Sequence, residues 1–129
     1  MELNNYKSDK YAIKLVVVGD FSTGKTSLIN LFSTGKISSY IQTTIGCAFS
    51  TYNYMSKHGI PIQLQIWDTA GQERYRSLME LYYRNTDIIL LCFDLNNKIT
   101  FDNISYWFNK TKSININKDS IYFLIGNKA

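Results

Sequence analysis

The sequence has little of what secreted or membrane proteins need. Its 129 residues include only two cysteines, one proline and one histidine. Cys47 and Cys92 both lie in apolar runs, which favours small buried side chains in a reducing compartment over a disulfide framework. No apolar run approaches the roughly 20 residues that span a bilayer, and the polar start MELNNYKSDK lacks an apolar signal core. We therefore expect a cytoplasmic protein.

Charge of one sign is not concentrated anywhere along the chain. The 14 Lys and Arg residues and the 10 Asp and Glu residues give a formal net charge of +4 and are interspersed throughout. Interspersed charges predict a solvated surface rather than a basic footprint, so we expect no nucleic-acid partner. A hydrophobic content of 45% suits one packed domain, which we place at residues 11–129 after a polar N-terminal extension at 1–10.

Apolar runs alternate with segments of helical periodicity. IKLVVVG, residues 13–19, is β-branched and nearly continuous, which is typical of a strand buried on both faces of a parallel sheet. The next segment, residues 25–32, spaces Leu28, Leu31 and Phe32 at helical intervals. Strand, glycine-containing loop and helix therefore follow one another directly.

Two strands, at residues 47–57 and 60–68, flank a turn at His58 and Gly59 and predict an antiparallel hairpin. His58 is a solvated turn residue, and we assign it no role. The other elements expected are a short helix ending near Tyr83, a strand at 87–94, an amphipathic helix at 100–112 with Phe101, Ile104 and Phe108 on one face, and a fifth strand at 121–126. This order predicts a doubly wound α/β sheet, mostly parallel, with its ligand at the carboxyl edge of the strands.

The segment GDFSTGKT, residues 19–26, follows the first strand and matches the phosphate-binding pattern GxxxxGK[ST]. In such a loop successive backbone N–H groups curl around phosphates, and the next helix adds its positive N-terminus. Lys25 bridges outer phosphate oxygens and Thr26 ligates Mg²⁺. Alone, the pattern could also be a chance match in a glycine turn before a helix. The nucleotide-binding residues expected here are Gly19, Phe21, Ser22, Thr23, Gly24, Lys25, Thr26 and Ser27.

A second motif, WDTAGQE at residues 67–73, suits the same ligand. Asp68 ends a buried strand and can sit behind the Mg²⁺, while Gly71 offers a backbone N–H to a terminal phosphate. With TTIG at 43–46, YYR at 82–84 and GNK at 126–128, the chain resembles the Ras-like small GTPases, and specifically the Rab family. The resemblance covers all 129 residues. It implies a P-loop NTPase fold and a GTP/GDP-dependent switch that regulates vesicle traffic.

The resemblance also implies roles for single residues. Thr44 is similar to the threonine that reaches Mg²⁺ and senses the terminal phosphate, although by itself it would be just a loop threonine. Asp68 is similar to the aspartate behind the metal, and Gln72 to the glutamine that orients the attacking water. Asn127 and Lys128 begin what looks like the NKxD guanine-recognition motif. Loss of the terminal phosphate would release Thr44 and Gly71 together, and with them a partner's surface.

Three aromatic residues, Phe49, Trp67 and Tyr82, match the trio that Rab proteins offer to effectors. For any single aromatic in a strand, core packing is the usual alternative. Because Asp68 must point to the metal, strand alternation places the Trp67 indole on the opposite face, and we favour an effector surface. The resemblance implies further partners, namely an exchange factor and a GTPase-activating protein.

The chain departs from the family pattern at its end and near the base. It stops at Ala129, one residue before the aspartate of NKxD, so we expect a truncated domain that lacks the last strand, the last helix and the cysteine-bearing tail. Ile37 replaces the aromatic ring usual beside guanine. We therefore expect a competent phosphate site with poor selectivity for GTP over ATP. Family members attach to the cytosolic face of endomembranes, but we expect no attachment without a prenylated tail.

Phe21 departs from the pattern at the loop position that, in the family, lies against the terminal phosphate. The backbone cradle does not need its side chain, so GTP binding should survive. The ring competes for the volume that Gln72 and the arginine of an activating protein must share, which predicts impaired hydrolysis. Two interpretations stay open: a Rab-like GTPase that hydrolyses GTP with Mg²⁺, or a truncated or non-hydrolysing interaction module.

Overall fold

The computed structural model describes residues 11–34, 47–69 and 81–128. The elements are β1 (Tyr11–Gly19), α2 (Lys25–Thr34), β2 (Cys47–Met55), β3 (Pro61–Thr69), β4 (Ile88–Asp94), α4 (Lys98–Asp102), α5 (Ile104–Ile114) and β5 (Ile121–Asn127). The five strands form one sheet in the order β2-β3-β1-β4-β5, and only the β2–β3 pair is antiparallel. The predicted α/β architecture, mostly parallel with one antiparallel hairpin, is confirmed.

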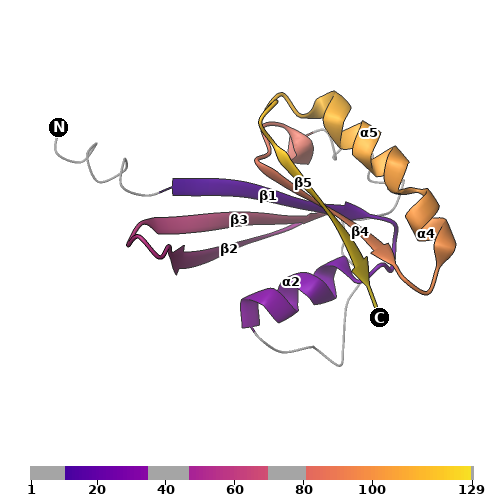
Figure 1. Cartoon of the computed structure of the whole chain (residues 1–129), viewed down its shortest axis with the longest axis horizontal. Coiled ribbons are helices and arrows are strands. Elements are labelled where there is room, and N and C mark those ends of the chain that lie inside the picture. The colour runs from indigo at the N-terminus through magenta and orange to yellow at the C-terminus, as the bar shows by residue number, and fades with distance from the viewer. Residues whose placement is uncertain (1–10, 35–46, 70–80, 129) are drawn as a thin grey trace.

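Strand β1 lies at the centre of the sheet because its apolar run can be buried on both faces. Val16 and Val18 pack with Trp107 of α5 on one face, while Val17 packs with Ile29 of α2 on the other. The two helices accordingly cover opposite faces of the sheet (Figure 1). This arrangement holds the carboxyl end of β1, and the loop that follows it, between α2 and α5.

The hairpin turn forms where the sequence predicts it. The Ser56 hydroxyl accepts hydrogen bonds from the backbone N–H groups of His58 and Ile60, at 3.3 and 3.1 Å. Gly59 has a φ of +77°, a left-handed conformation that glycine adopts without strain. His58 is exposed, as expected for a turn residue.

The helix predicted over 100–112 is wrong in its bounds and in part of its buried face. It is two helices, α4 and α5, that meet at Asn103. The turn there changes the helical phase, so Phe101 is 47% exposed, and its ring contacts Phe93 instead. Ile104 and Phe108 do pack against the core, together with the buried Trp107.

The structure also tests the predictions for Cys92 and for the helix that ends near Tyr83. Cys92 is a buried free thiol, as expected, and burial raises its pKa to about 11. The Cys47 side chain lies outside the part of the chain that can be described. Residues 81–83 are helical, in agreement with a helix ending near Tyr83. Among the described helices, none has the length and apolar character needed to cross a membrane.

Candidate functional site: a phosphate-binding loop

The loop between β1 and α2 can only be built with glycine at two positions. Gly19 has a φ of +151°, and a Cβ there would lie 2.3 Å from the carbonyl oxygen of Cys92. Gly24 has a φ of +88°, and a Cβ there would lie 2.3 Å from the Asn127 side-chain nitrogen. The two glycines therefore let the loop curl tightly against β4 and β5.

Lys25, the first residue of α2, reaches back into the loop. Its ammonium group is buried and donates to the carbonyl oxygens of Gly19 at 3.1 Å and Asp20 at 2.9 Å. Burial lowers the pKa of Lys25, while the nearby carboxylates of Asp68 and Asp20 oppose this effect. A buried cation in a loop of this shape is suited to bind an anion.

Thr26 and Asp68 place oxygen donors beside Lys25. The Thr26 hydroxyl donates to Asp68 Oδ2 at 2.5 Å, and the Asp68 side chain is buried. Asp68 Oδ1 is buried and has no hydrogen-bond partner among the described residues. Burial raises the pKa of Asp68, and the hydrogen bond from Thr26 and the charge of Lys25 oppose this. A hydroxyl and a carboxylate are hard oxygen ligands, so the residues present fit a Mg²⁺ ion.

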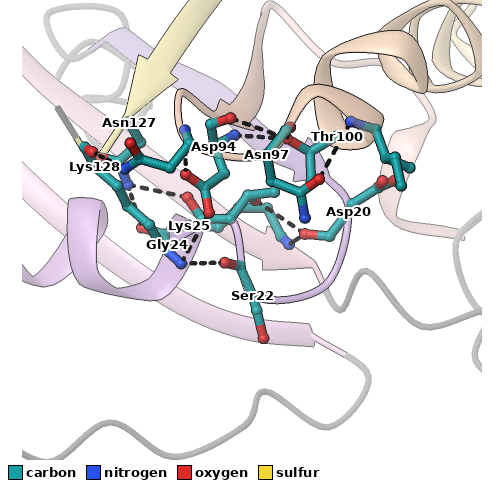
Figure 2. A network of polar contacts seen from close by, with 12 residues as sticks. Asp20, Ser22, Gly24, Lys25, Asp94, Asn97, Thr100, Asn127 and Lys128 are labelled. Carbon is teal, nitrogen blue, oxygen red and sulfur yellow. Dashed lines mark hydrogen bonds and ion pairs between the residues drawn. The ribbon is translucent and has the colours of Figure 1, made fainter.

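The two residues predicted for guanine recognition lie directly against this loop (Figure 2). The Asn127 side chain donates to the carbonyl oxygens of Thr23 and Gly24, at 3.1 and 3.2 Å. Lys128 donates to the carbonyl oxygen of Ser22 and lies 3.5 Å from an oxygen of Asp94. Hydrogen bonds therefore connect the end of β5 to the phosphate-binding loop.

The three unusual loop residues differ in their surroundings. Phe21 is 50% exposed, whereas Thr23 is fully buried and its hydroxyl donates to the carbonyl oxygen of Asp20 at 2.9 Å. Ser22 adopts a φ of +63°, a left-handed conformation that costs a non-glycine residue roughly 1–2 kcal/mol. Neither Ser22 nor Phe21 is buried, so their side chains do not fill the interior of the loop.

The aromatic trio comes together across β2, β3 and the segment before β4. The ring centroids of Phe49 and Trp67 are 4.6 Å apart, and those of Trp67 and Tyr82 are 5.7 Å apart. Phe49 is 52% exposed, while Trp67 and Tyr82 are partly buried against the core. The trio thus combines the exposed ring that an effector surface needs with the core packing that was the alternative.

Four other predicted positions, Ile37, Thr44, Gly71 and Gln72, lie outside the described residues. The site's described part therefore consists of the loop, Lys25, Thr26, Asp68 and the end of β5.

A model of the Ras family matches residues 14–129 of the chain. The chain belongs to the Ras family. It is similar to the Ras-related protein Rab-5B of Plasmodium falciparum, with 43% identity over 101 residues that make up 78% of this chain and 49% of that protein. It is 41% identical to the GTP-binding protein ypt2 of Schizosaccharomyces pombe over 123 residues, which are 95% of this chain and 60% of that protein.

Another relative of this Ras-family chain is a probable Rab-related GTPase of Acanthamoeba polyphaga mimivirus. The two are 34% identical over 126 residues, covering 95% of this chain and 57% of the viral protein. The chain spans about half the length of the curated relatives it matches. These relatives place the chain among the Rab proteins of the family.

Sequence reasoning missed one group of site residues in this Ras-family chain. The Asp20 carboxylate accepts a hydrogen bond from the Asn103 side chain at 2.6 Å and one from the Trp107 indole at 2.8 Å. An aspartate in a turn and a tryptophan in an amphipathic helix each have an ordinary local explanation. Because they are 87 residues apart, no local pattern could have paired them.

Proposed function

We propose that the chain is a Rab-type molecular switch that binds GTP and GDP with Mg²⁺, hydrolyses GTP, and regulates vesicle traffic through effectors. The observation that carries the proposal is the meeting of Lys25, Thr26 and Asp68 at the loop after β1. A buried cation, a hydroxyl and a partly unpaired carboxylate at a glycine-bounded loop are the parts that a nucleotide phosphate with Mg²⁺ requires.

The residues of this chain divide the work as follows. The loop amides and Lys25 would bind the phosphates, with Lys25 exchanging its bonds to loop carbonyls for phosphate oxygens. Thr26 and Asp68, with Thr44, would hold Mg²⁺, which supplies positive charge to neutralise the transferring phosphoryl group. Gln72 would orient the attacking water. Asn127 and Lys128 would contact the base from their place beside the loop.

The proposed partners follow from the Rab resemblance and the aromatic trio. An effector would bind at Phe49, Trp67 and Tyr82, since exposed aromatic residues cluster at binding sites. An exchange factor and a GTPase-activating protein would control the nucleotide state. Action at the cytosolic face of endomembranes, through a prenylated tail, is part of the same proposal.

Titration with fluorescent GDP, with and without Mg²⁺, tests the nucleotide site. We expect saturable binding of GDP that weakens when Mg²⁺ is removed. The substitution Lys25→Ala should weaken GDP binding by at least about 100-fold, because a charge-assisted phosphate contact is worth roughly 3 kcal/mol. Lys57→Ala, at an exposed lysine in the hairpin turn, is the matched control and should bind like the wild type. Absence of saturable binding would favour the nucleotide-free interaction module instead.

In this proposal Phe21 slows the hydrolysis step. Its ring is half exposed, so GTP could still enter, but by the family resemblance Gln72 and an incoming arginine would need room beside this loop position. We expect Phe21→Gly to raise the single-turnover hydrolysis rate with an activating protein at least about tenfold, or roughly 1.4 kcal/mol of barrier. Phe32→Ala, at a similarly exposed ring on α2, is the control and should leave the rate unchanged. Equal rates for Phe21→Gly and wild type would show that the steric argument is wrong.

A further inference from the structure

Asp20 is the one acidic residue in a loop that must hold a polyanion. A carboxylate facing the bound phosphates would repel them, but both oxygens of Asp20 point to helix α5 instead. One accepts from the Asn103 amide at 2.6 Å and the other from the Trp107 indole N–H at 2.8 Å. The charge is thus satisfied by two neutral donors on a neighbouring helix.

The backbone of the same residue supports the inside of the loop. The Asp20 carbonyl oxygen accepts from Lys25 Nζ at 2.9 Å and from the Thr23 hydroxyl at 2.9 Å. Side chain and carbonyl belong to one residue, so the bonds to α5 also orient the peptide group that holds Lys25. Asp20 therefore connects helix α5, through its carboxylate, with the hydrogen bonds inside the loop, through its carbonyl oxygen.

The partners on α5 are positioned for this contact rather than for their usual local roles. Asn103 precedes the first residue of α5, yet its side chain makes no capping hydrogen bond to that helix. Trp107 is 4% exposed and packs in the core cluster with Val16 and Val18 of β1. The buried Trp107 indole and the Asn103 amide, which is not used as a helix cap, thus hold the Asp20 carboxylate in place.

We infer that Asp20 is a positioning residue that, through Asn103 and Trp107, holds the phosphate-binding loop in its curled form. The inference rests on the proposed nucleotide site for its consequence, which is slow release of nucleotide. It assigns to α5 an indirect part in the site, through the bonds of Asn103 and Trp107 to the Asp20 carboxylate.

The free protein gives a first test that needs no nucleotide. In a ¹H–¹⁵N spectrum, the indole signal that disappears in Trp107→Phe belongs to Trp107. The other indole signal, from Trp67, is the reference, because the Trp67 indole N–H has no hydrogen-bond partner among the described residues. Asp20→Ala should shift the Trp107 signal and leave that of Trp67 in place. The Leu28 amide donates to the Gly24 carbonyl oxygen of the loop at 2.9 Å. Its hydrogen exchange should become about tenfold faster in Asp20→Ala, because a lost charge-assisted bond is worth roughly 1.4 kcal/mol or more.

A donor and acceptor swap gives the rescue. In the double variant Asp20→Asn with Asn103→Asp, the new amide at position 20 can accept from Trp107 and donate to the new carboxylate at position 103. The double variant should therefore recover the slow exchange of the Leu28 amide. An unchanged Trp107 signal in Asp20→Ala, or Leu28 exchange equal to that of the wild type, would overturn the inference.

The second test measures release of fluorescent GDP in the presence of Mg²⁺. Asp20→Ala should release GDP about tenfold faster than the wild type, and adding Trp107→Phe should cause no further increase, because both changes remove one link. Thr111→Val is the control, since it removes a buried hydroxyl bonded to the Trp107 carbonyl on the same helix. It should lower the urea midpoint without changing release.

The two tests separate the two proposals. Equal acceleration by Thr111→Val and Asp20→Ala would show that α5 acts only through general stability, and would overturn the positioning role. If the wild type binds no GDP, the proposed function fails, and the Trp107 signal and the Leu28 exchange of the free protein alone decide the role of Asp20.

Discussion

At the residue scale, the site holds two buried ionisable groups, Lys25 and Asp68, and burial disfavours the charged form of each. Burial lowers the pKa of Lys25 and raises that of Asp68, and each partly offsets the penalty of the other. Mutual compensation is incomplete, because the pKa of each remains shifted toward its neutral form. A bound phosphate with a cation would supply the missing opposite charges, which explains why such a costly pair belongs at a binding loop rather than in a core.

The raised pKa of Asp68 predicts a pH dependence of stability. Between its unfolded value near 3.8 and its higher folded value, the native state binds a proton that the unfolded state does not. The contribution of Asp68 is therefore fully present below the unfolded pKa and is lost as the pH rises through the folded pKa. We expect the unfolding free energy of the wild type, relative to Asp68→Asn, to increase as the pH falls from 7 toward 4.

Urea unfolding of both proteins without nucleotide, at several pH values, measures this difference. The substitution keeps an oxygen to accept from Thr26, so the two proteins differ mainly in the titration of residue 68. If the difference in unfolding free energy between the two proteins stays constant, or if the wild type loses stability relative to Asp68→Asn at low pH, then burial does not dominate the pKa of Asp68.

Some site residues could be predicted from the sequence and others could not, for a physical reason. Lys25, Thr26 and Asp68 belong to short motifs in which each residue type has its own chemical task, so spacing alone identifies them. The bonds from Asp20 to Asn103 and Trp107 depend instead on how α5 lies against β1. That geometry is set by core packing, which no local pattern records.

At the element scale, strands were easier to predict than helix faces. Strand β1 has an almost continuous β-branched run, and its burial on both faces follows from that run. The region after β4 carries a helical pattern, but the break at Asn103 depends on contacts outside the helix. The Thr100 hydroxyl donates to the carbonyl of Asn97 and accepts from the N–H of Asp94, and so ties α4 to the end of β4. This fixes α4 in a different phase from α5.

At the scale of the whole molecule, the loop after β1 joins elements that are distant in the sequence. Asn127 connects it to β5, Asp20 connects it to α5, and Lys25 belongs to α2. The hairpin turn near Gly59 lies at the opposite end of the sheet (Figure 1). A ligand that orders the loop should therefore stabilise the molecule unevenly.

Hydrogen exchange with and without GDP and Mg²⁺ measures this unevenness. At about 100 times its Kd, a ligand adds up to about 2.7 kcal/mol to the stability of the state that binds it. We expect amides in β5 and the first turn of α5 to exchange at least about tenfold more slowly. Those at residues 53–62 should change by less than about threefold, because local opening of the hairpin end would leave the ligand bound. Asn127→Ala should reduce the protection of β5 more than that of α5, because it removes only the β5 link. Equal slowing of all amides would mean that the ligand acts through global unfolding alone, and that the bonds of the loop to β5 and α5 do not transmit its effect.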